Sequence, residues 1–201
     1  MSNNKYGKSG QYVFRVMTLF ASVCSGLPAH ADWTLQETSQ IGFVSIKNNS
    51  IGENNLFQRV SGSISDEGRV SVTIDLTSVE TGVGIRNERL QTILFKVASF
   101  PAAKIKTTLS APQLMALRGG GNATESVALD VSLHGKTVSK MADLTVSVLD
   151  GNVRVTSTQP IIITAKDFGL ESGVAALQKI AGLSAISRSI PITVDLRLKA
   201  N

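Results

Sequence analysis

Apolar and polar residues alternate along much of the chain, and a period of two is typical of strands with one buried and one solvated face. The alternation is clearest at residues 69–76, 127–134 and 190–199. Weaker strand patterns occur at residues 33–47, 56–64, 104–117 (with a break near Ser110), 141–149 and 153–164. Turn residues separate the segments, as at Asp66-Glu67-Gly68 and Asp150-Gly151-Asn152. We therefore predict eight or nine antiparallel strands.

Two segments lack this alternation. Residues 85–94 place Leu90, Ile93 and Leu94 at helical spacing between charged and polar residues. Residues 174–186 gather apolar residues on one helical face and contain several good helix formers. We expect both segments to be short helices that pack at a mouth of the β structure.

The strands have one dry face each, which favours an antiparallel barrel or sandwich over a parallel sheet. A closed barrel has the further advantage that it leaves no exposed strand edges. We predict an all-β protein, an extended antiparallel β-barrel of about eight strands with one or two short helices at its mouth. A barrel of this size either fills itself with side chains or holds one small ligand, and the periodicity does not distinguish the two.

The N-terminal region has the pattern of an export signal. A positively charged segment precedes an uncharged run at residues 16–24, and Ala29-His30-Ala31 offers the small residues that a signal peptidase requires. We expect residues 1–31 to be a cleavable secretory signal and residues 32–201 to form one periplasmic domain. The alternatives are a transmembrane anchor, for which the run is short against roughly 20 residues, and a lipoprotein acylated at Cys24.

The charge of the chain argues against a nucleic-acid partner. The sequence has 20 Lys and Arg against 15 Asp and Glu, a formal net charge of +5. Three of the basic residues and none of the acidic ones lie in residues 1–31, so cleavage leaves 17 against 15, a net charge of +2. The remaining basic residues are spread singly, whereas nucleic-acid-binding proteins gather them on one face.

Few residues suit catalysis or metal binding. Residues 32–201 contain no cysteine and one histidine, His134, which the alternation places on the polar face of its strand. That supply is too small for a zinc site, and no serine elbow motif is present. The glycine clusters at residues 82–84 and 119–121 lack the remaining residues of nucleotide-binding loops and are interpreted as turns. We predict no enzyme, metal or cofactor, with a carboxylate-pair hydrolase as the open alternative.

Four blocks of sequence carry a more specific signal. They are Ser39-Gln40-Ile41-Gly42-Phe43; Ile74 to Gly82 followed by Arg86-Asn87-Glu88-Arg89-Leu90, Phe95 and Phe100-Pro101; Leu133 to Val138; and Asp167-Phe168-Gly169-Leu170 with the strand at residues 194–198. Their order resembles the YceI-like family of bacterial periplasmic, polyisoprenoid-binding proteins, from about Trp33 to the C-terminus.

The resemblance implies a lipocalin-like barrel with a long apolar channel that encloses one isoprenoid, quinone or fatty amphiphile. Candidate channel residues are Ile41, Phe43, Phe57, Leu90, Ile93, Leu94, Phe95, Phe100 and Phe168, with Arg86 and Asn87 as possible head-group contacts. We expect a periplasmic carrier, monomeric or homodimeric, that exchanges its lipid with a membrane or membrane protein. The alternative is a filled barrel that serves as a structural or protein-interaction module of the cell envelope.

Overall fold

The structure, a computed structural model, describes residues 31–201, so the predicted signal segment lies outside the described residues except for its last residue, Ala31. The strands are β1 (Ala31–Leu35), β2 (Gln40–Lys47), β3 (Ile51–Phe57), β4 (Val60–Ser65), β5 (Arg69–Asp75), β6 (Val79–Glu80), β7 (Ala102–Thr108), β8 (Gly121–Leu133), β9 (Lys136–Leu149), β10 (Asn152–Ser157), β11 (Ile161–Thr164) and β12 (Ser189–Ala200). Neighbouring strands pair antiparallel throughout this part of the chain. The sheet in the described residues is therefore entirely antiparallel, as the alternating segments predict.

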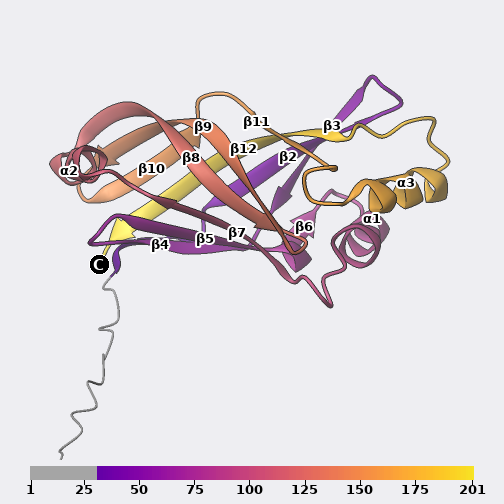
Figure 1. Cartoon of the computed structure of the whole chain (residues 1–201), viewed down its shortest axis with the longest axis horizontal. Helices are drawn as coiled ribbons and strands as arrows, with labels where there is room; N and C mark the ends of the chain where they lie inside the picture. Colours follow the sequence, from indigo (N-terminus) through magenta and orange to yellow (C-terminus); the bar gives the residue numbers. More distant parts are fainter. Residues whose placement is uncertain (1–30) are drawn as a thin grey trace, which may run out of the picture.

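Eight of the strands close into a ring. They follow the order β1-β4-β5-β7-β8-β9-β10-β12, and β12 returns to β1 with Trp33 opposite Ala200. Figure 1 shows the ring as an elongated barrel with helices at its two ends. The predicted all-β class and the extended antiparallel barrel of about eight strands are confirmed.

Local interruptions divide several of the long predicted strands into two parts. The chain leaves the ladder between β1 and β2, where the hydroxyl of Ser39 donates to the carbonyl oxygen of Arg197 and accepts from its N–H. Ser39 is fully buried, and its side chain takes the place of the missing backbone bonds to β12. Because of such breaks, β12 pairs with β10 and β11 on one side and with β1 and β2 on the other.

The helices agree with the prediction at one end of the barrel and differ at the other. Helix α1 (Gly84–Arg89) continues into the π-helix η2 (Leu90–Phe95). Helix α3 (Glu171–Ile180) begins three residues before the helix predicted at residues 174–186 and ends six residues before that helix ends. A short 3-10 turn, η1 (Leu76–Ser78), links β5 to β6. No helix within residues 31–201 is long and apolar enough to span a membrane.

The strand predicted for residues 104–117 is wrong in its second half. Strand β7 ends at Thr108, and residues 111–119 form the helix α2 (Ala111–Gly119). Ser110 accepts a hydrogen bond from the N–H of Gln113, and the Gln113 side chain accepts one from the N–H of Ser110. This reciprocal capping box, with a proline in the first turn, begins a helix even where the apolar residues also fit a strand.

Candidate functional site

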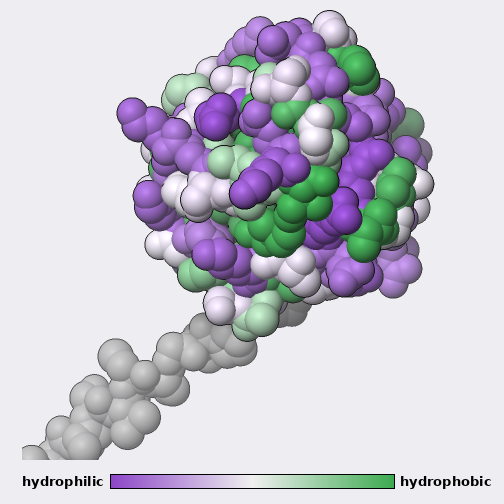
Figure 2. Space-filling view, turned by 90° about the vertical axis from the view of Figure 1, so that its right-hand side faces the viewer, coloured by the Kyte–Doolittle hydropathy of each residue, from purple (hydrophilic) through white to green (hydrophobic). Residues whose placement is uncertain are grey.

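An apolar cavity of about 470 Å³ lies between the barrel and the helices α1, η2 and α3. Strand alternation creates it, because Ile41 and Phe43, two residues apart in β2, and Phe57 of β3, which pairs with Ile41, all face the cavity. Val83 and Ile85 line the cavity and are also 39% and 53% exposed, so it opens to solvent beside α1. Figure 2 views this end, where hydrophobic surface lies beside hydrophilic surface.

Most of the predicted channel residues meet at this cavity. Those that line it are Ile41, Phe43, Phe57, Leu90, Leu94, Phe95 and Phe168. Three of the rings form a continuous series, with centroids 5.3 Å apart between Phe43 and Phe57 and 5.9 Å apart between Phe57 and Phe95. The fold thus brings residues from four segments of the chain together around the main cavity. That these residues contact a ligand stays a prediction.

Two predicted channel residues are not among those that line the cavity. Phe100 packs on the ring of His134, with centroids 4.4 Å apart. His134 is not on the polar face of a strand but in the β8–β9 turn, where its φ is +51°. The backbone of Ile93 lies against Gly173 of α3. Both residues therefore hold elements together at this end of the barrel.

A second cavity, of about 200 Å³, lies beneath α2 at the other end of the barrel. Ile41, Ile105, Leu129 and Val194 line both cavities. We call these four residues the neck, because they lie between the two cavities. The barrel therefore contains a cavity toward each of its ends, with the neck between them.

The lining becomes polar toward the open end. Along β2 and β3 the facing pairs change from Ile41 with Phe57, through Phe43 with Asn55, to Ser45 with Glu53. Asn55 is 6% exposed, and its Nδ2 donates to the carbonyl oxygen of Glu53 at 2.9 Å and to Ser45 Oγ at 3.1 Å. The cavity wall is amphipathic along its length, with its polar groups near the mouth.

Sequence reasoning missed these polar residues, although one signal for them was available. Ser45 and Lys47 follow Ile41 and Phe43 at intervals of two along β2, so the same alternation carries them to the cavity side. Glu53 and Asn55 lie in a segment for which no strand was predicted, and only the pairing with β2 makes their direction evident.

The two predicted head-group contacts have different surroundings. Arg86 lines the cavity and pairs with Glu53, which also accepts from Lys47 at 2.7 Å. The hydrogen bond from Lys47 and the nearby charge of Arg86 lower the pKa of Glu53 against the opposing effect of burial. Asn87 does not line the cavity, because its Oδ1 accepts from the N–H and hydroxyl of Thr81.

The cavity offers little for catalysis. Glu53 is the one carboxylate that lines it in the described part of the chain, so no carboxylate pair faces this space. Within residues 31–201, no three His, Cys, Asp or Glu side chains gather as a metal would require. The arrangement can bind an apolar chain and a polar group at its end.

Barrel and cavities together define a class of protein, the closed antiparallel β-barrel with apolar cavities in its interior. The YceI-like domain matches residues 33–198, and the chain belongs to the YceI-like family. No curated protein sequence matches the chain.

Solved structures agree with this assignment. A polyisoprenoid-binding domain from Saccharophagus degradans, implicated in plant cell wall breakdown, has 30% identity and a TM-score of 0.81, over 86% of this chain and 100% of that one. BcnA of Burkholderia cenocepacia has 17% identity and a TM-score of 0.63, over 81% and 98%. The YceI protein of Campylobacter jejuni has 14% identity and a TM-score of 0.55, over 73% and 84%. The last two show likeness of fold alone.

Proposed function

We propose that this protein is a periplasmic binding protein that encloses the apolar chain of an isoprenoid or another long-chain amphiphile and performs no chemistry on it. The observation that carries the proposal is the pair of apolar cavities inside the barrel, whose linings share the four neck residues. The similar domain from Saccharophagus degradans is described as polyisoprenoid-binding, which supports the same ligand class here.

Burial alone supplies enough free energy for this role. Each methylene moved from water into an apolar space contributes about 0.8 kcal/mol. A tail of ten such groups therefore gains roughly 8 kcal/mol before the costs of ordering, which corresponds to micromolar binding. A carrier of this kind needs a dry interior and an opening, and no catalytic group.

The cavity also bears on the alternative of a filled barrel. A filled barrel would carry large side chains to its axis, whereas Ala103, Ala165 and Val131 face the space here. The opening beside α1 gives a lipid a route between the barrel and a membrane or membrane protein. We therefore favour a carrier over a purely structural module.

Mass spectrometry of an organic extract tests the proposal. The protein is purified without detergent from the periplasmic fraction of its own host, so that its presence in that fraction tests the location as well. A stoichiometric prenyl or acyl chain is the expected result. A folded, monodisperse protein that yields a clean extract and takes up no added long-chain amphiphile would overturn the proposal.

A further inference from the structure

The charged residues of the cavity are concentrated at its mouth and are predominantly positive. Within the described part of the chain, Lys47 of β2, Glu53 of β3, and Arg86 and Arg89 of α1 are the charged residues that line the main cavity. Three positive charges thus face one negative charge at the open end of an otherwise apolar space.

Glu53 compensates only part of this charge. Its carboxylate accepts from Lys47 and pairs with Arg86, and its lowered pKa keeps it ionised at neutral pH. One carboxylate shared by two cations leaves one positive charge in excess within the group.

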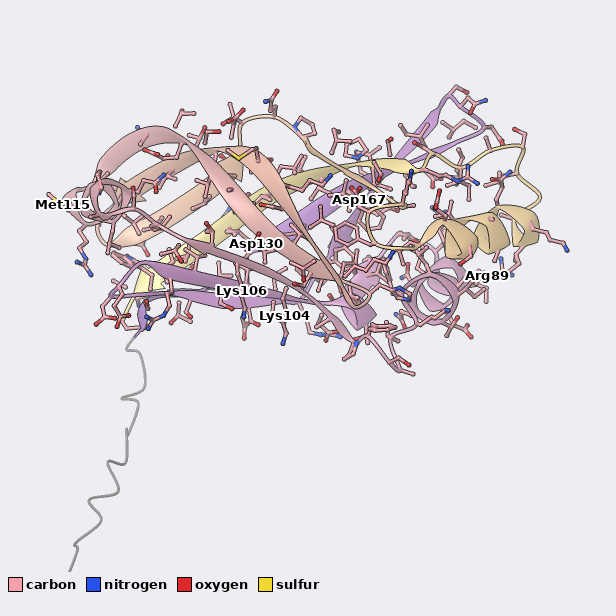
Figure 3. The ribbon with its side chains drawn as sticks, viewed as in Figure 1. Arg89, Lys104, Lys106, Met115, Asp130 and Asp167 are labelled. Atoms are coloured by element: carbon pink, nitrogen blue, oxygen red, sulfur yellow. The ribbon has the colours of Figure 1, made fainter. Side chains whose placement is uncertain are left out.

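Arg89 adds a second unbalanced charge. It follows Arg86 by three residues, so the two side chains share a face of α1. Arg89 lines the cavity and is half-buried, yet within residues 31–201 it forms no salt bridge or side-chain hydrogen bond. Figure 3 labels it at the end of the barrel that carries α1 and α3.

An unpaired guanidinium beside an apolar cavity is a specific recognition element. It offers several N–H donors in a planar fork, which matches a carboxylate or phosphate group. A hydroxyl group would leave the excess positive charge uncompensated, while an oxyanion would neutralise it.

Resting on the function proposed above, we propose that the mouth selects amphiphiles with an oxyanion head group, a carboxylate or a phosphate, with Arg89 as its principal partner. The tail then enters the barrel toward the neck, and the head group stays beside α1. Arg86 stays engaged with Glu53 and contributes long-range charge.

Competition binding with three probes of equal chain length tests this inference. Hexadecanoic acid, hexadecyl phosphate and hexadecanol are each titrated against the full chain, stripped of lipid and loaded with a fluorescent fatty-acid analogue. The acid and the phosphate are expected to bind more tightly than the alcohol. In Arg89→Gln the two anionic probes are expected to weaken roughly ten- to hundredfold, and hexadecanol to change little.

Lys179→Gln is the matched control. Lys179 is an exposed cation of α3 at the same end of the molecule, but it does not line the cavity, so its removal should leave the ranking of the probes unchanged. Equal loss in both variants would show a diffuse charge effect and would overturn the role of Arg89.

The outcomes separate the two proposals. If hexadecanol binds the unsubstituted protein as tightly as the anionic probes, the head-group inference is refuted and the carrier function stands. If none of the three probes binds, both fail. The ranking in the unsubstituted protein decides the head-group preference even if Arg89→Gln does not fold.

Discussion

A tryptophan at the neck should set a limit to the length of the bound tail. Ile105 of β7 lines both cavities, while Lys104 and Lys106 on either side of it are exposed on the outside of the barrel (Figure 3). In Ile105→Trp the larger side chain fills part of the neck and separates the two spaces. Lys106→Trp introduces the same residue on the outer face of the same strand and serves as the control.

The expected magnitude follows from the length of β8. From Leu133 to Leu129 the strand advances about 13 Å, and from Leu129 to Gly121 about 26 Å, at roughly 3.3 Å per residue. More than half of β8 therefore lies beyond the neck, alongside the second cavity. Each methylene that is kept from passing the neck loses about 0.8 kcal/mol of burial free energy. Four such methylenes therefore weaken binding by about 3 kcal/mol, or roughly two orders of magnitude in Kd.

The assay is a titration with saturated fatty acids of increasing length. In the unsubstituted protein and in Lys106→Trp, Kd should fall about fourfold per added methylene until the tail reaches the end beneath α2. In Ile105→Trp the fall should stop at a shorter chain. If the two tryptophan variants reach their plateau at the same length, the tail does not pass the neck and the reasoning is refuted.

Three further predictions concern stability. Phe168 is fully buried in the core beside the cavity, and Phe168→Ala should lower the free energy of unfolding by about 3–5 kcal/mol in urea titrations, with a loss under about 1 kcal/mol contradicting its role. In Gly62→Ala the new Cβ would lie 2.3 Å from a backbone carbonyl oxygen of β5, whereas in Gly52→Ala the nearest atom is 3.8 Å away, so calorimetry should show a much lower Tm for the first variant only. Partial burial raises the pKa of Asp75, but hydrogen bonds from Thr77 and an arginine outweigh it, and the net pKa lies below 3.8. The ionised Asp75 carboxylate therefore stabilises the folded state above pH 3.8, and this stabilisation is lost as the pH falls through the lowered pKa. The free energy of unfolding of Asp75→Asn should therefore depend less on pH below 3.8 than that of the unsubstituted protein.

The fold was largely predictable from sequence because most of its strands bury one face only. β8 alternates over residues 127–133 and β12 over residues 190–199, so their inward residues in these stretches follow from the pattern. β3 was not predicted in full, since residues 52–55 are glycine and polar residues with low strand propensity. Pairing with β2 orders this segment, and the pairing is a property of the folded chain.

The helix α2 shows a different limit of prediction from sequence. The capping box of Ser110 and Gln113 was present in the sequence, but the apolar residues around it also fit a strand. The cavity mouth shows a third limit, since Glu53 and Arg86 are 33 residues apart and meet only through the tertiary fold. Local sequence patterns therefore predict helices and strands and their buried faces. Ion pairs between residues far apart in the sequence become evident only in the folded barrel.

The position of β12 has a consequence for the order of events during folding. Residues 189–200 are the last strand of the described chain, yet they pair with β1, β2, β10 and β11 and close the ring. Pairings between residues so far apart in sequence form slowly, because a long loop must close first. A chain in which residues 189–200 have not yet paired therefore has an open sheet, and the lipid-sized interior forms only after this one strand has joined both edges.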